Sequence, residues 1–293
     1  MPLEFTCVAD IKGRIAEGPV YDERTDRLYF VDILNRVVYG VDVATDERAS
    51  WTFESEVGSI GLAASGALVV ALRHSVVLFD PESGRRADLC SIEESEGART
   101  RLNDGRVGPD GAFWVGSMDD RPEKEPIGAL YRVDPTGKVE RRVERVVISN
   151  GLAWTADGET MFHADTRGPW IDRWRFDRAT GAISERTRFA APDEVGRPDG
   201  GSCDAEGFYW SAGVTGGRLN RFAPDGSLAE SFEVPVPTPT MVCFGGRDFR
   251  TIYVTSLTEN RDPAMFANAK CAGGLLAAKA PVAGFPSWRF LDI

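Results

Sequence analysis

Short apolar runs separated by polar turns recur along the whole chain. Each run is rich in aromatic and β-branched residues and follows an Asp-Gly, Ser-Gly or similar turn, a pattern typical of β-strands. No window of about twelve residues has a convincing amphipathic helical period, and only a short helical turn is expected, around residues 262–269. The clearest runs are residues 28–31, 68–71, 113–115, 161–163, 208–210 and 252–254. The pattern therefore predicts an all-β protein.

These runs mark six repeat units. The turns that precede them lie 40 to 49 residues apart, and a period of this size with about four strands per unit is typical of a β-propeller. We therefore predict a six-bladed β-propeller of four-stranded antiparallel blades, in which residues 1–293 form a single catalytic domain. Since an open ring would expose strand edges, we expect the N-terminal residues 5–8 and the C-terminal residues 288–291 to share one blade and close the ring. A pair of β-sandwiches is the alternative, and six units at one period disfavour it.

Four oxygen-bearing residues occur at one phase of this repeat: Glu17, Asn103, Asn150 and Asp199. The last three each precede a turn glycine by eight residues. Because the first strand of a blade lies nearest the central channel, residues at its start should face the channel mouth. Carboxylate and amide oxygens are ligands for hard divalent cations, so the phase predicts a metal site.

The ring of donors is incomplete, and its members have a second interpretation. The equivalent positions in units two and six, near residues 58–59 and 241–242, offer little ligating oxygen, which leaves one side open for water or a substrate oxygen. Asn-Gly and Pro-Asp-Gly are also ordinary turn sequences, and turns at repeated places are expected in a propeller. Spacing alone leaves both interpretations open.

Composition excludes several classes of function. The net charge of −11 and the pI of about 4.9 argue against binding to nucleic acid or to an anionic membrane. No apolar run approaches the roughly 20 residues of a membrane span, and the N-terminus has no signal-peptide pattern.

The five cysteines form no CxxC pair, so we expect reduced thiols in a cytoplasmic protein. With two histidines and no Gly-x-Ser-x-Gly motif, a serine hydrolase is disfavoured, and His163 is expected to make a structural hydrogen bond.

Several phrases around these residues resemble one known family. They are Ala-Glu-Gly-Pro at 16–19, Arg-Leu-Asn-Asp-Gly at 101–105, Gly-Ser-Met at 116–118, Gly-Ala-Leu-Tyr at 128–131, Ser-Asn-Gly-Leu at 149–152, Pro-Asp-Gly at 198–200, Cys-Phe-Gly-Gly at 243–246 and Ala-Gly-Gly at 272–274. In combination and order they resemble the senescence marker protein/gluconolactonase/luciferin-regenerating enzyme family, which includes regucalcin and bacterial sugar lactonases. The resemblance covers nearly the whole chain.

The resemblance implies a six-bladed propeller with one catalytic divalent metal in its channel. By motif position, Glu17, Asn150 and Asp199 match the family's metal ligands, and Asp199 also matches its general base. Arg101 and Asn103 match substrate contacts, which moves Asn103 from the ligand set toward the substrate.

One motif departs from the family pattern. In the animal branch an acidic residue that meets the sugar lies three positions after the methionine of Gly-Thr-Met. Here Met118 is followed by Asp119, Asp120 and Arg121. Either Asp119 or Asp120 substitutes for that residue, or Arg121 favours a different hydroxyl pattern or an acidic lactone.

The predicted function is a metal-dependent sugar lactonase, a carboxylic ester hydrolase of the gluconolactonase or arabinonolactonase type. Its substrate would be an aldono-lactone such as L-arabinono-, D-galactono-, xylono- or gluconolactone. Oxygen-only ligation favours Ca²⁺, Mg²⁺ or Mn²⁺, and Zn²⁺ and Fe²⁺ also accept such sites. We expect Ca²⁺ as the bound ion. A regucalcin-like calcium-binding regulatory protein and a scaffold propeller are the alternatives. A monomer is expected, because a closed ring needs no partner to cover its edges.

Overall fold

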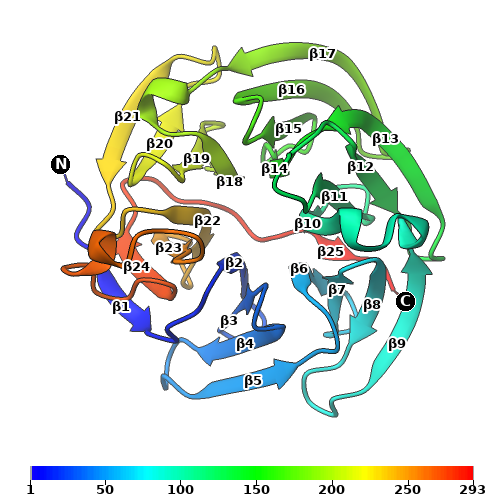
Figure 1. Cartoon of the computed structure of the whole chain (residues 1–293), viewed down its shortest axis with the longest axis horizontal. Helices are drawn as coiled ribbons and strands as arrows, with labels where there is room; N and C mark the ends of the chain where they lie inside the picture. The colour runs from blue at the N-terminus through cyan, green and yellow to red at the C-terminus, as the bar shows by residue number, and fades with distance from the viewer. Residues whose placement is uncertain (1, 293) are drawn as a thin grey trace.

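The computed structural model describes residues 2–292 and shows six antiparallel sheets arranged radially around one axis (Figure 1). Blade one comprises β2 (Ala16–Asp22), β3 (Arg27–Asp32), β4 (Val37–Asp42) and β5 (Arg48–Thr52), and blade two comprises β6 (Val57–Ala63), β7 (Leu68–Leu72), β8 (Ser75–Phe79) and β9 (Arg86–Ser91). Blade three comprises β10 (Thr100–Val107), β11 (Phe113–Asp119), β12 (Gly128–Val133) and β13 (Val139–Val146), and blade four comprises β14 (Ser149–Trp154), β15 (Thr160–Asp165), β16 (Trp170–Asp177) and β17 (Ala182–Ala190). Blade five comprises β18 (Pro198–Cys203), β19 (Tyr209–Gly213), β20 (Arg218–Phe222) and β21 (Leu228–Glu233), and blade six comprises β22 (Pro239–Gly245), β23 (Thr251–Ser256), β24 (Leu275–Lys279) and β1 (Thr6–Ala9). The predicted six-bladed propeller is confirmed.

Helical structure is confined to three short 3₁₀ segments within residues 2–292: η1 (Glu94–Arg99), η2 (Asp193–Val195) and η3 (Pro263–Phe266). The last of these coincides with the helical turn predicted around residues 262–269. It begins where Asp262 accepts a hydrogen bond from the backbone N–H of Ala264 at 2.9 Å. In the described part of the chain no helix is long and apolar enough to cross a membrane.

The ring is closed by the N-terminal strand, because β1 pairs antiparallel with β24 as the outermost strand of blade six. The prediction that residues 288–291 share this blade is wrong. Instead β25 (Arg289–Phe290) pairs in parallel with β6 as a fifth strand of blade two. The preceding segment runs across the middle of the ring (Figure 1), and Phe285, Ser287 and Trp288 line small cavities at one end of the channel. The C-terminal segment therefore closes one end of the channel, which we call the base.

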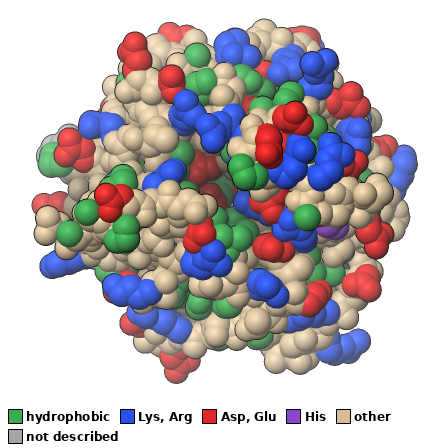
Figure 2. Space-filling model, in the orientation of Figure 1, with side chains coloured by type: hydrophobic (Ala, Val, Ile, Leu, Met, Phe, Trp, Pro, Cys, Tyr) green, Lys and Arg blue, Asp and Glu red, His purple; other side chains and the backbone are tan. Residues whose placement is uncertain are grey.

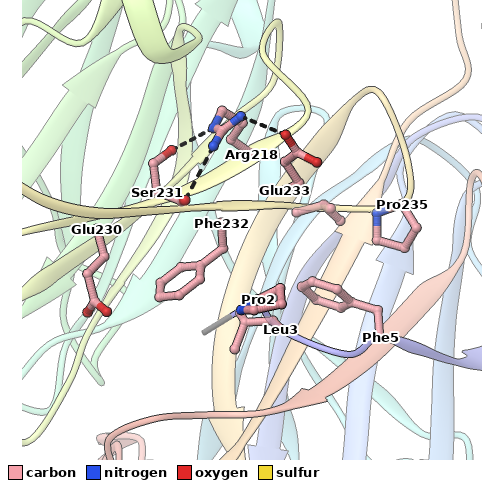
Figure 3. Close-up of a pocket in the computed structure, with 10 residues that line it drawn as sticks. Pro2, Leu3, Phe5, Arg218, Glu230, Ser231, Phe232, Glu233 and Pro235 are labelled. Atoms are coloured by element: carbon pink, nitrogen blue, oxygen red, sulfur yellow. Dashed lines mark hydrogen bonds and ion pairs between the residues drawn. The ribbon is translucent and has the colours of Figure 1, made fainter.

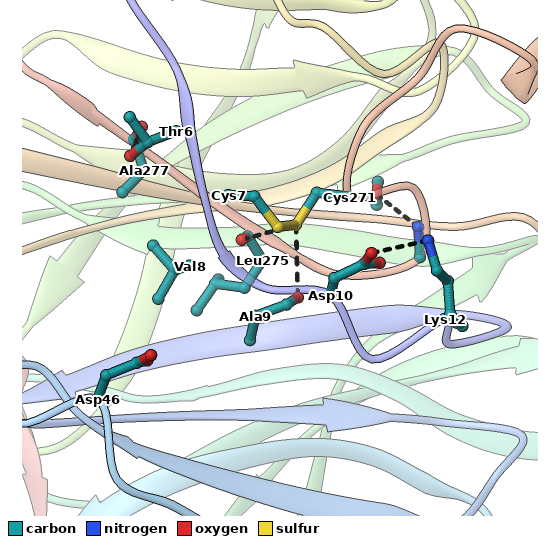
Figure 4. The surroundings of a disulfide bond; sticks show 12 residues. Thr6, Cys7, Val8, Ala9, Asp10, Lys12, Asp46, Cys271, Leu275 and Ala277 are labelled. Carbon is teal, nitrogen blue, oxygen red and sulfur yellow. Dashed lines mark hydrogen bonds and ion pairs between the residues drawn. A yellow bond between two sulfur atoms is a disulfide. The ribbon is translucent and has the colours of Figure 1, made fainter.

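A disulfide joins Cys7 of β1 to Cys271, just before β24, across a sequence separation of 264 residues (Figure 4). The prediction of five reduced thiols is therefore wrong for this pair, and Cys90, Cys203 and Cys243 are free. The disulfide forms because ring closure brings the first strand against the last blade, which places the sulfur atoms of Cys7 and Cys271 within bonding distance. The disulfide and the β1–β24 pairing lie at the same joint.

The blades pack face to face through aromatic side chains. Between blades three and four, Trp114, Trp154 and Phe176 meet edge to face with ring centroids 5.6 to 6.1 Å apart. Aromatic pairs in this geometry stabilise a core beyond the area that they bury. The innermost strands, which carry the candidate site, are thus anchored from behind by a dense apolar core.

Each innermost strand has a register irregularity near the same end. The irregularities fall between Glu17 and Val20, Val57 and Ser59, Leu102 and Gly105, Asn150 and Ala153, Pro198 and Gly201, and Pro239 and Val242. A β-bulge locally bends a strand and redirects side chains, often beside a binding site. Because the six inner strands run in the same direction along the channel, all six bulges lie at the end opposite the base, which we call the mouth.

Candidate metal and substrate site

The structure places the four phase-matched residues on four different blades at the mouth: Glu17 on β2, Asn103 on β10, Asn150 on β14 and Asp199 on β18. All four are at most 7% exposed. Figure 2 shows acidic side chains inside a central hollow on this face of the molecule. The bulges of blades two and six carry Gly58 and Thr240 instead, and the Thr240 hydroxyl donates to the Ala16 carbonyl at 2.6 Å. The ring of polar donors is therefore one-sided.

A continuous hydrogen-bond chain connects three of these residues to Arg101. The Nη1 of Arg101 donates to Oδ1 of Asn103 at 2.7 Å, and Nδ2 of Asn103 donates to Oδ1 of Asn150 at 3.0 Å. The Nδ2 of Asn150 then donates to Oδ1 of Asp199 at 2.5 Å. Each of these side chains is thus oriented by the next one. The amide groups of Asn103 and Asn150 are therefore fixed relative to the Asp199 carboxylate.

Glu17 and Asp199 are two carboxylates without a cationic partner. Burial raises the pKa of Glu17 well above its usual range, and repulsion from Asp199 adds to the effect. Burial likewise raises the pKa of Asp199, with repulsion from Asp104 as the next cause. Among residues 2–292 neither carboxylate forms an ion pair with Lys or Arg. Two buried carboxylates beside amide oxygens are a donor set that fits a hard divalent cation, which would neutralise their charge.

Other ligand types do not contribute to such a site. Within the described residues, no group of three or more His, Cys, Asp or Glu side chains could hold a metal ion. A cation bound by Glu17 and Asp199 would therefore also need amide oxygen, and Asn150 is the nearest source by its bond to Asp199. The oxygen-only set is the type preferred by Ca²⁺, Mg²⁺ and Mn²⁺.

Asp104 is a third buried carboxylate beside this pair. Its Oδ2 accepts the backbone N–H of Leu152 at 3.0 Å, and its Oδ1 has no partner within the described residues. Burial raises the pKa of Asp104 too. Its place directly after Asn103 in the sequence predicts either a residue that supports Asn103 or simply a turn residue. Asp104 connects β10 to β14 and adds negative potential to the channel.

Asp119 and Asp120, the two consecutive aspartates after Met118, have different surroundings. The Asp119 side chain is fully buried and holds Arg121 through Nε at 2.9 Å and Nη2 at 3.0 Å, and the backbone N–H of Glu125 at 2.7 Å. These hydrogen bonds, that from Arg121 above all, hold the pKa of Asp119 well below its usual range. Asp120 instead accepts from Nε of Arg101 at 3.2 Å and from Nη2 of Arg73 at 2.7 Å. Successive side chains at a strand end point to opposite sides, so only Asp120 faces Arg101.

His163 and Ser149 form a buried pair behind Asn150. The distance from His163 Nε2 to Ser149 Oγ is 2.8 Å, and both residues are fully buried. Burial, followed by repulsion from Arg186, lowers the pKa of His163 to about 3, so the imidazole is neutral at ordinary pH. No solvent reaches the Ser149 hydroxyl, and the pair fits the structural hydrogen bond expected for His163.

A large groove lies away from the mouth. A groove of about 770 Å³ runs between the N-terminal segment and β21 at the outer edge of the ring (Figure 3). Leu3, Phe5 and Phe232 form its apolar lining, while Arg218 is bound to Ser231 and Glu233. None of the polar residues of the mouth lines it. The size of a groove therefore does not by itself mark the site, and the paired buried carboxylates make the mouth the candidate.

Comparisons with known proteins agree on one family. The model of the SMP-30/Gluconolactonase/LRE-like region matches residues 15–258. A 6-deoxy-6-sulfogluconolactonase of Pseudomonas putida is 34% identical over 279 residues, which cover 95% of each chain, and a regucalcin of Xenopus laevis is 32% identical over 89% of each. A crystal structure described as a calcium-binding protein, regucalcin, from Agrobacterium tumefaciens superposes with a TM-score of 0.93 at 26% identity, covering 99% of this chain and 98% of the other. A luciferin-regenerating enzyme superposes with a TM-score of 0.89 at 26% identity over 99% of each chain. The chain belongs to the SMP-30/gluconolactonase/LRE-like family.

Proposed function

We propose that this protein is a metal-dependent sugar lactonase that hydrolyses an aldono-lactone to the free aldonic acid. The observation that carries the proposal is a pair of buried carboxylates, Glu17 and Asp199, that repel each other. Asp199 also ends the hydrogen-bond chain that begins at Arg101. The names of the relatives, a sulfogluconolactonase among them, support a sugar lactone as the substrate class.

Glu17, Asn150 and Asp199 would hold the cation. Ca²⁺ is the first candidate, because the donors are all oxygen and a close structural neighbour is described as a calcium-binding protein. Mn²⁺, Mg²⁺, Zn²⁺ and Fe²⁺ also accept oxygen ligands. When bound, the cation supplies a Lewis acid that polarises the lactone carbonyl and lowers the pKa of water.

Asp199 acts as the general base. A water oxygen attacks the lactone carbonyl carbon while the Asp199 carboxylate accepts the water proton. The ring C–O bond then breaks, and the ring oxygen takes up that proton to become a hydroxyl. The bond from Asn150 Nδ2 holds the Asp199 carboxylate in one orientation throughout.

Arg101 and Asn103 bind the substrate. The Arg101 guanidinium is buried and is held by Asp120 on one side and by Asn103 on the other. Held in this way, Arg101 donates no hydrogen bond from Nη2 within residues 2–292, so this group can orient sugar hydroxyls and stabilise negative charge on the carbonyl oxygen. Both amide hydrogens of Asn103 are donated within the protein, to the Ser149 carbonyl and to Asn150 Oδ1, so Asn103 would meet the substrate through its amide oxygen and would position Arg101. Asp120 is the aspartate that we assign beside them, because Asp119 is fully occupied by its own loop.

A panel of lactones and cations tests this function. Chelator-treated protein should release no protons from glucono-, galactono-, xylono- or arabinonolactone beyond the spontaneous rate, and adding one cation should restore proton release. If none of the lactones is hydrolysed with Ca²⁺, Mn²⁺, Mg²⁺, Zn²⁺ or anaerobic Fe²⁺, the lactonase proposal is wrong.

A calcium-binding protein without relevant lactonase activity is the second candidate. The structural neighbour named a calcium-binding protein, together with the oxygen-only donor set, favours it. Calorimetric Ca²⁺ binding that Asp199→Ala abolishes, with no turnover of any lactone, would support this candidate over the enzyme.

A further inference from the structure

The mouth loops carry cationic side chains on a protein whose net charge is −11. In Figure 2, Lys and Arg side chains stand around the central hollow in which the acidic groups lie. Three of the cations at this end are Lys124 in the β11–β12 loop, Arg167 in the β15–β16 loop and Arg261 in the β23–β24 loop. All three loops connect the second to the third strand of a blade, so they open at the mouth.

Most acidic side chains of the mouth loops are already paired. Asp119 and Glu125 hold Arg121, Glu56 and Asp120 hold Arg73, Glu259 holds Arg14 and Asp193 holds Arg197. Within residues 2–292, by contrast, the guanidinium groups of Arg167 and Arg261 have no hydrogen-bond or ion-pair partner, and Lys124 donates only to the Asp119 carbonyl, at 2.7 Å. Arg121, the residue that the sequence suggested for an acidic lactone, is therefore occupied, while these three cations are available.

Lys124 is held in place by its loop. Its φ of +56° lies in the left-handed region, which non-glycine residues seldom adopt. The loop is fixed by the Asp119 carboxylate, which binds Arg121 and the Glu125 backbone, and the Lys124 ammonium returns to the Asp119 carbonyl. A preorganised cation loses little freedom when it binds an anion.

The three loops place these cations at the same end of the channel as the proposed site. Repulsion from Arg101 and Arg167 contributes to lowering the pKa of Lys124, after burial, which is the largest cause. Lys124 and Arg167 lie on mouth loops of the adjacent blades three and four, and blade three also carries Arg101. Arg261 lies on a mouth loop of blade six, across the ring from blade three.

We infer that Lys124 and Arg167, flanked by Arg261, bind an anionic group at the end of the lactone remote from its carbonyl. This inference rests on the proposed lactonase function. The lactone carbonyl would lie over Glu17 and Asp199, and a sulfonate, phosphate or carboxylate on the same sugar would meet the rim. Three acceptor oxygens can satisfy an ammonium and a guanidinium at once.

Matched substrates and variants test the inference. A neutral gluconolactone is compared with gluconolactones that carry a sulfonate, a phosphate or a carboxylate at the far carbon. Wild-type kcat/KM should be about tenfold or more higher for at least one anionic lactone than for the neutral lactone. The preferred lactone shows whether the site takes a sulfonate, a phosphate or a carboxylate. Lys124→Gln or Arg167→Gln should lower the anionic-to-neutral ratio by about 10–100-fold, the usual range for a charge-assisted hydrogen bond.

Arg85→Gln is the control. Arg85 is an exposed arginine in the β8–β9 turn at the base, so this variant removes the same charge far from the mouth and should leave the ratio unchanged. If Lys124→Gln fails to fold, as judged by circular dichroism, Arg167→Gln still tests the inference, because the Arg167 guanidinium forms no hydrogen bond or ion pair within residues 2–292. Raising the salt concentration should also reduce the anionic preference of the wild type.

The outcomes separate this inference from the proposed function. Hydrolysis of the neutral lactone with no anionic preference, or equal losses on both substrates, overturns the anion site and leaves the lactonase intact. Absence of turnover on every lactone overturns both.

Discussion

The mouth and the base of the channel are built from the same six inner strands, yet they differ in chemistry. At the mouth each strand has an irregular register, and Glu17, Asn103, Asn150 and Asp199 face one another. At the base the strands pair regularly and apolar side chains meet the C-terminal segment, with Phe290 fully buried. Within one repeat, the strand ends with an irregular register carry the buried polar groups, and the regularly paired ends carry the packed apolar groups.

The C-terminal tail makes the base a structural end. Its backbone bonds to Ala64 at 2.8 Å and to Gly111 at 3.1 Å, and the Asp292 carboxylate accepts from Ser65. These contacts join the base turns of blades two and three. Substitutions at the base should therefore change the stability of the protein, and substitutions at the mouth should change its activity.

The largest effect is expected from Asp199→Ala at the mouth. Loss of the base and of one carboxylate ligand should lower kcat for lactone hydrolysis at least about 10³-fold, within the range of general acid–base catalysis. Thermal unfolding should shift little, because the change also removes repulsion from Asp104. A folded variant with wild-type turnover in the presence of cation would contradict the assignment.

Phe290→Ala tests the opposite end. Truncation of this fully buried ring, which packs on β6, should cost about 3–5 kcal/mol of unfolding free energy. The kcat per folded molecule should stay close to wild type. Urea denaturation followed by tryptophan fluorescence measures the unfolding free energy. A loss of kcat as large as that of a mouth variant would contradict the assignment of the base to stability alone.

Asn103→Ala should lower kcat by about 10²–10³-fold, as for the loss of one group that stabilises a developing oxyanion, because Arg101 loses the acceptor that positions it. It also removes the acceptor of Arg101 Nη1 and the donor to Asn150 Oδ1. Cation affinity measured by calorimetry should change less than kcat. A large loss of affinity would instead place Asn103 among the ligands.

Reduction of the Cys7–Cys271 disulfide should destabilise the ring at its joint. Opening this cross-link should cost about 2–4 kcal/mol, because the unfolded chain regains the freedom of a long loop. The thermal midpoint with and without reductant measures the effect. Cys7→Ser should remove the response to reductant, whereas Cys90→Ser should preserve it.

His163 should make the protein sensitive to acid. Its folded pKa of about 3 is below the ordinary 6.5, so below pH 6.5 the unfolded chain binds a proton that the folded chain does not. Stability is therefore lost as the pH falls from 6.5 toward 3, by up to about 1.4 kcal/mol per pH unit. The urea midpoint of the wild type should be lower at pH 5 than at pH 7, and this difference should be smaller for His163→Gln. An unchanged pH dependence would contradict this origin of acid sensitivity.

The sequence alone determined the repeat and, through it, the position of the site. Six units at one period require a radial arrangement, so a polar residue at one phase of each unit must recur around one axis. That is why Glu17, Asn103, Asn150 and Asp199 could be grouped before their contacts were seen. Strand direction also follows from the repeat, which sends the loops after every second strand to the same end.

Only the tertiary structure decided the contacts between distant segments. The pairing of β25 with β6 and the disulfide between Cys7 and Cys271 depend on where the chain ends meet after the ring has closed. The separation of Asp119 from Asp120 depends on the side to which each points at the end of β11, and on Arg121, which neutralises the buried one. The local pattern of apolar and polar residues determines the repeat length and the place of a residue within each repeat. The strand pairing, the disulfide and the aspartate orientations depend on packing and charge compensation across the closed ring.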